Sequence, residues 1–291
     1  TATVMSGDMD IVIAGGVESM SRVPMGLSTQ LPYKNGFGTY KSPRIEDRYP
    51  GIRFSQFTGA EMLAKKYDLS RAELDAYALK SHQRAMAATT GGKFAAEIVP
   101  IDLTLEGGAT ERHDTDEGIR WDATLESIGS VKLLAEDGRI TAATSSQICD
   151  GAAGVMIVNE RGLKTLGVSP LARIHSMTVI GHDPVIMLEA PIPATLKALE
   201  RAGLKIGDID LYEVNEAFAS VPTAWLKVTG GDPDKLNVNG GAIALGHPLG
   251  GSGAKLMTTL VHAMRDRGAR YGLQTMCEGG GLANVTIVER L

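Results

Sequence analysis

Hydrophobic positions in the second half of the chain switch repeatedly between strand spacing and helix spacing. This pattern predicts five strands, at 171–181, 210–214, 236–238, 273–277 and 283–289. Between them it predicts helices at 194–202, 216–228 and 252–267. Strands that alternate with helices need crossover connections, so we expect an α/β fold with a largely parallel or mixed sheet covered by helices on both faces.

The first half of the chain contains a second set of elements. The continuous apolar run Asp10–Gly16 is typical of a strand buried on both faces of a sheet, and Gly7 before it is a helix-ending glycine. Helical spacing over 70–89 begins at Ser70, and Glu73 completes a capping box. We therefore expect a strand near the start of the chain and a long helix about fifty residues later.

Two segments lack periodicity. Residues 22–57 are rich in Pro, Gly, Lys, Arg and Tyr, and long connections of this kind often cover a functional site. Residues 106–122 are polar and include the run His113–Glu117, which could suggest a metal site. That run lacks ligand spacing and a second cluster, so we interpret it as a solvated loop and expect no bound metal.

Composition narrows the class of protein. The 291 residues are 43% hydrophobic, which is enough for a substantial core. A net charge of −5 gives no general attraction to nucleic acid. Only two cysteines are present, and no apolar run is long enough to span a membrane. We expect a cytoplasmic protein that neither binds nucleic acid nor spans a membrane.

Two glycine-dense turns carry reactive side chains. His247 lies in the run Asn239–Pro248, and Cys277 begins the run Cys277–Gly281. Glycine is used where the backbone needs positive φ or close approach, so these turns favour a reactive His–Cys pair. The structural alternative is a lone buried histidine and a lone buried cysteine.

Other candidate motifs are weaker. The run Gly250–Lys255 is glycine-rich, but Leu256 follows the lysine where a phosphate-binding loop requires Ser or Thr. Cys149 lies in a turn before an apolar run, which favours a structural cysteine. Asn215 follows the predicted strand 210–214, at the sheet edge where α/β proteins bind ligands, and could donate to a developing oxyanion.

Three of these segments together resemble a known family. Asn215-Glu216-Ala217-Phe218, Gly246-His247-Pro248 and Cys277-x-Gly279-x-Gly281 are similar, in order and spacing, to the C-terminal motifs of the thiolases, which are acetyl-CoA acyltransferases. The segment Ala14–Ser21 resembles a fourth family motif. The resemblance extends over essentially the whole chain.

The resemblance implies a layered α/β/α/β/α fold with two similar halves related by a pseudo-twofold axis. Residues 1–21 and 130–167 would form the remainder of the N-terminal half. Residues 22–129 would form an inserted loop domain, and 168–291 the C-terminal half. By the same resemblance, the protein would associate as a homodimer or homotetramer.

The resemblance also implies roles for individual residues. His247 would activate the nucleophilic thiol and help to bind the thioester oxygen in an oxyanion hole, and Asn215 would position a water in the same oxyanion hole. Cys277 would exchange a proton with the acetyl-CoA Cα, and the backbone N–H of Gly279 would serve the second oxyanion hole. These residue types suit the chemistry, because carbon next to a thioester is deprotonated only with a base and a preorganised oxyanion hole.

Coenzyme A would be a substrate, and we expect no further cofactor. By resemblance, Ser146 would contact the pantetheine arm and Arg120 the nucleotide end of CoA. The family's nucleophile lies in a Cys-x-Ser-Gly turn that no segment here matches. We expect that cysteine upstream of Thr1, and we expect residues 1–291 alone to be inactive.

Two departures bear on the substrate. Ser55–Phe57 and Leu188–Ala190 differ from the short-chain biosynthetic members, near the family's acyl pocket. They favour a degradative 3-ketoacyl-CoA thiolase that accepts a longer or bulkier acyl group, such as a sterol side chain. The alternatives are an acetoacetyl-CoA-forming biosynthetic thiolase and a non-catalytic CoA- or lipid-binding protein. A decarboxylating condensing enzyme would share the fold, but such enzymes generally have a second histidine where Cys277 stands, so the cysteine argues against it.

Overall fold

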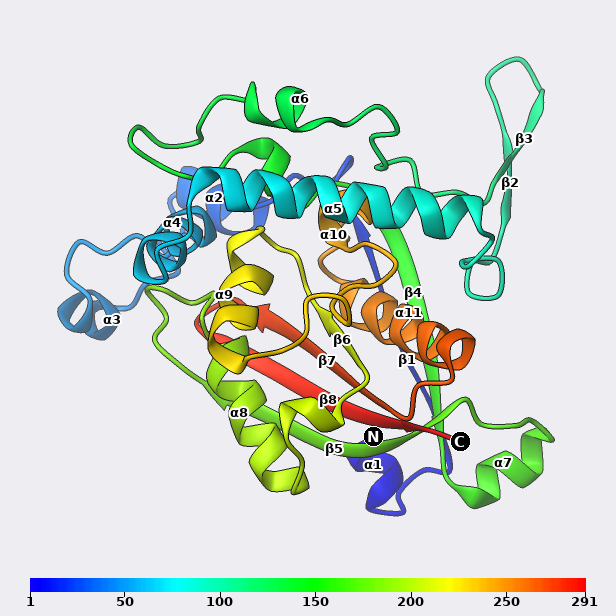
Figure 1. The fold of residues 1–291 in the computed structure, drawn as a ribbon. Helices are drawn as coiled ribbons and strands as arrows, with labels where there is room; N and C mark the ends of the chain where they lie inside the picture. The colour runs from blue at the N-terminus through cyan, green and yellow to red at the C-terminus, as the bar shows by residue number, and fades with distance from the viewer.

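The computed structural model describes residues 1–291, with a four-stranded sheet in the C-terminal part (Figure 1). The strand order is β5-β8-β7-β6. β6 and β7 are parallel, and the other pairs are antiparallel, which confirms the predicted mixed sheet. The strands are β5 (Ala172–Gly181), β6 (Leu211–Val214), β7 (Tyr271–Glu278) and β8 (Leu282–Arg290).

One predicted strand of this half does not form. Asn237 has φ 44, which is left-handed backbone that a regular strand cannot contain. Leu236 therefore makes only an isolated bridge with Tyr212 on β6. The turn is held by the Asn237 side chain, whose Oδ1 accepts from the backbone N–H of Val214 at 2.8 Å.

Helices cover both faces of this sheet. On β8, Ile287 belongs to the main hydrophobic core, whereas its neighbour Val288 packs with Leu260 in a separate cluster. Successive residues of a strand point to opposite faces, so the helices that pack on them lie on opposite sides. The helices are α8 (Pro191–Ala202) and α9 (Ser220–Thr229) on one side, and α11 (Ser252–Arg267) on the other.

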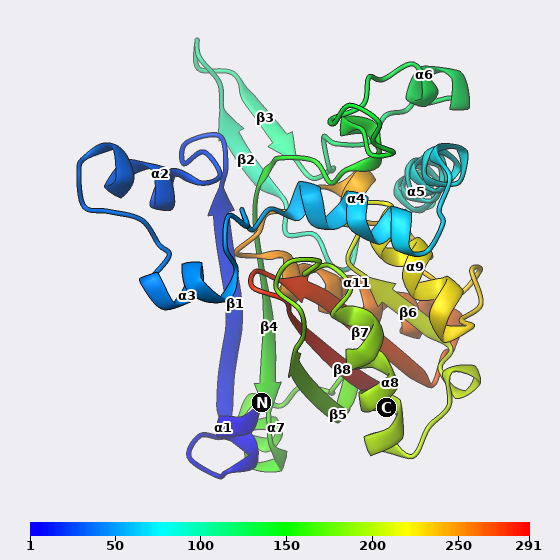
Figure 2. The same cartoon turned by 90° about the vertical axis from the view of Figure 1, so that its left-hand side faces the viewer.

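A second sheet lies against the far side of α11 (Figure 2). It consists of β1 (Ile11–Ser19) paired antiparallel with β4 (Asp150–Val158). Ile13 is 78% exposed and Val17 is 72% exposed, so the expectation of a strand buried on both faces is wrong for this structure. Only one face of β1 packs against described residues, and the other faces outward.

The segment between β1 and β4 contains most of the remaining helices. Where the sequence predicted only aperiodic chain, two short helices form in 22–57, and a strand forms in the polar segment 106–122. These elements are α2 (Leu27–Lys34), α3 (Pro43–Arg48), α4 (Gln56–Lys66), α5 (Arg71–Thr90), β2 (Ile101–Thr104), β3 (Thr110–His113) and α6 (Leu125–Gly129). Two short helices, α1 (Ala2–Met5) and α7 (Glu160–Leu166), lie at one end of the β1–β4 pair (Figure 2).

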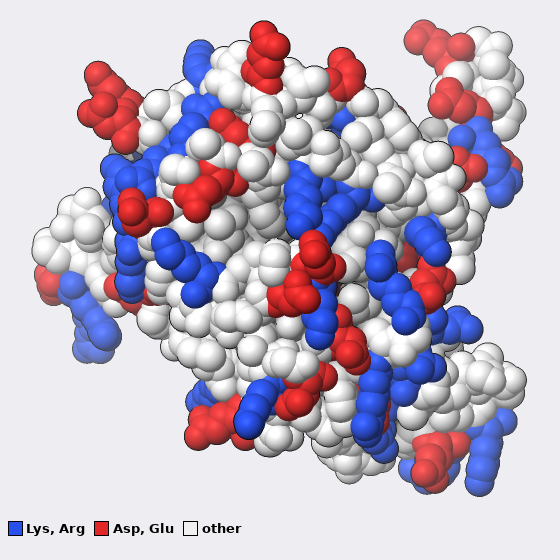
Figure 3. All heavy atoms as spheres, in the orientation of Figure 1, with Lys and Arg blue, Asp and Glu red and all other residues white.

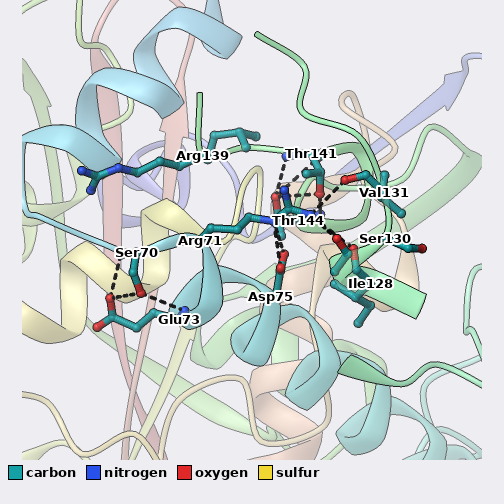
Figure 4. Close-up of polar contacts among 12 residues, drawn as sticks. Ser70, Arg71, Glu73, Asp75, Ile128, Ser130, Val131, Arg139, Thr141 and Thr144 are labelled. Carbon is teal, nitrogen blue, oxygen red and sulfur yellow. Dashed lines mark hydrogen bonds and ion pairs between the residues drawn. The ribbon is translucent and has the colours of Figure 1, made fainter. Parts of the chain in front are cut away.

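The predicted capping box starts α5 (Figure 4). The Ser70 hydroxyl accepts from the backbone N–H of Glu73 at 3.2 Å, and the Glu73 carboxylate accepts from the backbone N–H of Ser70 at 2.7 Å. One residue further on, Arg71 pairs with Asp75 at 2.8 Å and donates to the carbonyl of Val131 at 2.9 Å. The segment that follows α6 is thereby fixed to α5.

The surface is mixed in charge. Basic and acidic side chains are interspersed over the face shown in Figure 3. None of the helices combines the length and the apolar character needed to cross a membrane. No group of three or more His, Cys, Asp or Glu side chains is placed to hold a metal ion.

Candidate active site

A cavity of about 260 Å³ brings together three of the residues singled out in the sequence: His247, Cys277 and Gly279. His247 comes from a glycine-rich turn, and Cys277, thirty residues further along, comes from the end of β7 just before a second glycine-rich turn. The other lining residues are Gln56, Met187, Leu188, Ala217, Leu249, Met276 and Glu278. The walls are mostly apolar with a few polar groups, which is typical of a small-molecule site.

His247 lies in the connection between α10 (Ala242–Leu245) and α11. Gly246 before it has φ 82, a conformation that L side chains rarely adopt. A Cβ at Gly246 would also lie 2.6 Å from Cys149 Sγ. The glycine is thus required twice, for its φ and for close contact with Cys149.

Ser252 fixes the protonation pattern of the His247 ring. The Ser252 hydroxyl donates to the carbonyl of Pro248 at 2.9 Å, so its oxygen is free to accept from His247 Nδ1–H at 2.5 Å. The proton then resides on Nδ1, and Nε2 is left with its lone pair. Nε2 faces Asn215 Nδ2 at 3.2 Å, so the amide is the donor in that contact.

His247 is poised as a neutral base. Burial, reinforced by the positive charge of Lys255, lowers the pKa of His247 to about 4. The imidazole is therefore unprotonated near pH 7 and can take a proton on Nε2.

Asn215 is held directly behind this imidazole. It follows β6, and its backbone N–H donates to the carbonyl of Thr275 on β7 at 3.0 Å. Its side-chain Oδ1 is buried and has no hydrogen-bond partner. Asn215 also lines a separate cavity of about 10 Å³, close to the smallest volume that holds one water molecule.

Cys277 lies near the end of β7, opposite Ala283 of β8. Burial raises the pKa of the Cys277 thiol to about 12, and the neighbouring carboxylate of Glu278 adds to the effect. The thiol is therefore protonated near neutral pH and is suited to donating a proton. Gly279, the residue expected to offer a backbone N–H, begins the turn that leads to β8.

The two residues expected to contact CoA lie outside the cavity lining. The backbone N–H of Ser146 donates to the carbonyl of Ala217 at 3.0 Å. The next residue, Gln147, accepts through its carbonyl from the backbone N–H of His247 at 3.2 Å, so Ser146 lies beside the His247 loop. Arg120 is exposed, and its backbone N–H donates to His82 Nδ1 on α5 at 3.2 Å.

Glu216 is a buried residue that the sequence placed in a motif without giving it a task. Its carboxylate accepts from Tyr77 at 2.8 Å, Ser81 at 2.7 Å and the backbone N–H of Ile243 at 3.0 Å. It thus joins α5 to α10, just before the His247 turn. Glu216 lies two residues after β6, and no local pattern marked its role, because its partners are far away in sequence.

The protein is thus an α/β protein in which a neutral histidine and a protonated thiol line one cavity, and this combination is typical of an enzyme. Family models for the thiolase N-terminal domain and the thiolase C-terminal domain match residues 1–161 and 168–290. The chain belongs to the thiolase family, and its fold is the thiolase fold.

Individual relatives agree with this assignment. The chain is 49% identical to the steroid 3-ketoacyl-CoA thiolase FadA6 of Mycobacterium tuberculosis, over 99% of this chain and 70% of that protein. It is 43% identical to the acetyl-CoA acetyltransferase of Shinella zoogloeoides, over 99% and 74% of the two chains. The crystal structure of human mitochondrial 3-ketoacyl-CoA thiolase superposes with a TM-score of 0.85 at 37% identity, covering 100% of this chain and 74% of that one.

Proposed function

We propose that this protein contributes the proton-transfer and oxyanion machinery for CoA-dependent cleavage of a 3-ketoacyl-CoA to acetyl-CoA and a shortened acyl-CoA. The observation that carries the proposal is that His247 and Cys277 line one cavity in opposite protonation states. One group is ready to accept a proton and the other to donate one.

The chemistry assigns each group a step. His247 Nε2 takes the proton of a nucleophilic cysteine thiol, whose thiolate attacks the keto carbon. The Cα–Cβ bond then breaks, and the electron pair remains on the acetyl-CoA Cα as an enolate. Cys277 donates its proton to that carbon and regains one from the thiol of free CoA, whose thiolate takes the acyl group from the cysteine. The released cysteine thiolate recovers its proton from His247.

Oxyanion stabilisation falls to two further residues. Asn215 holds a water that donates to the developing oxyanion, which the unpartnered Oδ1 supports. The backbone N–H of Gly279, on the cavity wall beside Cys277, donates to the enolate oxygen. Removal of one such donor in other enzymes costs about a hundredfold to a thousandfold in rate.

The acyl group is longer or bulkier than acetyl. The cavity walls include Gln56 and Leu188, from the two segments that depart from the short-chain pattern. The higher identity to a steroid 3-ketoacyl-CoA thiolase than to an acetyl-CoA acetyltransferase supports degradation of lipid or steroid acyl chains. Coenzyme A enters as a substrate, with Ser146 beside its pantetheine arm and Arg120 near its nucleotide end.

Residues 1–291 by themselves do not complete the reaction. The acyl-enzyme route needs a reactive thiolate beside a base. Burial raises the pKa of the Cys149 thiol, and Cys277 is assigned to proton transfer, so neither described cysteine suits the nucleophile's role.

We also propose that the protein assembles as a homodimer or homotetramer in the cytoplasm. Both cysteines are free thiols, as a reducing compartment requires, and the outward face of β1 exposes Ile13 and Val17. Light scattering at micromolar concentration should give a mass of at least two chains, and a monomer mass would contradict the assembly.

The reaction is tested with Cys277→Ala in the native polypeptide, meaning the polypeptide that carries the nucleophilic cysteine. This change should abolish exchange of the acetyl-CoA Cα proton with solvent deuterium, while acylation of the nucleophile survives. Thr165→Ala, on exposed α7, is the control and should leave exchange within about twofold, as for a substitution outside the site. Exchange at the wild-type rate in Cys277→Ala would remove Cys277 from the mechanism, and binding of acyl-CoA without any cleavage would indicate a non-catalytic module.

A further inference from the structure

A buried carboxylate lies just before α8, away from the groups assigned above. Glu189 is 4% exposed, and three side chains converge on it. Lys66 Nζ lies 2.6 Å from one carboxylate oxygen, and His182 Nε2 lies 2.9 Å from the other. The Tyr67 hydroxyl donates a hydrogen bond to the same carboxylate.

The carboxylate is charged at neutral pH. Burial alone would raise the pKa of Glu189, but the hydrogen bonds from His182, Lys66 and Tyr67 outweigh it and lower the pKa. A buried charge is tolerated only where such partners surround it, and loss of one partner leaves the charge uncompensated.

The partners belong to two different parts of the chain, and each part has residues on the large cavity. Lys66 ends α4 and Tyr67 follows it, while Gln56 at the start of the same helix lines the cavity. Met187 and Leu188, directly before Glu189, line it as well. The carboxylate thus connects the helix behind one wall to the segment that forms another.

The segment before Glu189 needs such an anchor. Met187 has φ 30, a strained conformation for a residue with a side chain. α4 also packs so closely on it that a Cβ at Gly59 would lie 2.8 Å from the carbonyl of Ile186. Strain of this kind persists only where surrounding contacts hold the backbone in place.

We propose that Glu189, with Lys66, Tyr67 and His182, is a positioning residue that fixes the spacing between the α4 wall and the Met187–Leu188 wall, and so sets selectivity for bulky acyl groups. This inference rests on the proposed thiolysis reaction. Glu189 does not touch the reacting atoms, so its effect is on how the acyl chain is accommodated.

The test compares acyl groups in the native polypeptide. For wild type and Glu189→Gln, kcat and KM are measured with acetoacetyl-CoA and with a branched or ring-bearing 3-ketoacyl-CoA. Glu189→Gln should lower the ratio of kcat/KM for bulky over four-carbon substrate by about tenfold, since pocket discrimination is of that order. The loss should be in KM for the bulky substrate, with kcat for acetoacetyl-CoA within about twofold.

Lys66 offers a milder pair of variants, because its side chain is 54% exposed and its replacement is compatible with folding. Lys66→Met should shift the ratio in the same direction as Glu189→Gln, and Lys66→Arg, which keeps the ion pair, should restore it. Glu200→Gln, an exposed carboxylate on α8, is the matched control and should behave as wild type.

Three outcomes would overturn the proposal. One is a selectivity ratio unchanged within twofold in both Glu189→Gln and Lys66→Met while the wild type cleaves 3-ketoacyl-CoA. Another is an equal loss of kcat with every substrate, which would show a general effect on the fold or on catalysis. A wild type that cleaves no 3-ketoacyl-CoA would instead reject the proposed function, and the inference with it.

Discussion

His247 Nδ1 lies 2.5 Å from the hydroxyl oxygen of Ser252, five residues further along the chain. Because the Ser252 proton is committed to the carbonyl of Pro248, the imidazole must be the donor in this contact. The serine therefore decides which ring nitrogen acts as the base. It does so from the first residue of α11, where the helix starts against the glycine-rich turn.

Ser252→Ala should slow thiolysis in the native polypeptide by about tenfold to a hundredfold, a part of the usual contribution of a general base. The change removes the acceptor that keeps the proton on Nδ1, so the fall should be in kcat. Thr165→Ala is a suitable control, because Thr165 makes the same bond to the carbonyl four residues earlier, on exposed α7. Equal kcat in the two variants would contradict the tautomer assignment.

Asn215→Asp should change the pH dependence as well as the rate. A carboxylate beside Nε2 favours the charged imidazolium, so it raises the pKa of His247 from about 4. Wild-type kcat/KM should be independent of His247 titration between pH 6 and pH 8, whereas the variant should lose activity toward pH 6.

Asn215→Ala separates the two effects of that change. It removes the donor without adding charge, so it should cost about a hundredfold to a thousandfold in rate while the acid limb stays in place. An acid limb that moves equally in Asn215→Ala and Asn215→Asp would rule out the electrostatic explanation.

The turn after Cys277 allows strain and crowding to be told apart. Gly280 has φ 84 with nothing near a Cβ, while Gly281 has φ 78 and a Cβ there would lie 2.8 Å from the carbonyls of His182 and Asp183. Gly280→Ala should cost about 1 kcal/mol of stability from backbone strain alone. Gly281→Ala should cost at least about 2 kcal/mol more, because backbone must move.

Thermal unfolding of the two variants side by side measures this difference. Gly281→Ala should also lower activity, since its hydrogen bond to His182 N–H holds the chain that leads to the Met187–Leu188 wall. Equal melting temperatures for the two variants would show that the close approach is relieved at no cost.

Local signals in the sequence were sufficient for most of the C-terminal half and for the two reactive turns. The helix predicted at 252–267 is α11 itself, and the turns were found because glycine marks unusual backbone. The failures have physical causes. Asn237 is left-handed because its side chain bonds the Val214 backbone, and no local pattern reveals that contact.

Burial and polar networks were the least predictable, since they depend on tertiary neighbours. The apolar run of β1 predicts burial on both faces of the strand, yet the side chains of Ile13 and Val17 are exposed. α2 and α3 are short and have no buried residues, so they lack the apolar stripe that would mark a helix. Glu189 was noted only as a departure from a motif, because its partners on α4 lie more than a hundred residues away.

Glu97 gives a prediction about stability that is independent of the reaction. One of its carboxylate oxygens accepts from Thr259 at 3.1 Å, and the other is buried without a partner. Burial raises the pKa of Glu97 to about 7, and the negative charges of Asp116 and Asp266 reinforce the shift. The folded state therefore holds this proton more tightly than the unfolded state, in which a glutamate has an ordinary pKa near 4.5.

The contribution of Glu97 to folding stability therefore depends on pH. As pH rises from about 4.5 to about 7, the unfolded state loses the Glu97 proton first, so the contribution of Glu97 to folding stability falls across this window.

Glu97→Gln removes the penalty and should stabilise the protein at pH 8 by about 1 kcal/mol, reduced from the full shift because the residue is partly solvated. At pH 4.5 the two proteins should melt together. Melting temperatures of wild type, Glu97→Gln and the exposed control Glu106→Gln at both pH values measure the effect, and a gain of equal size at pH 4.5 would show that packing, not ionisation, is responsible.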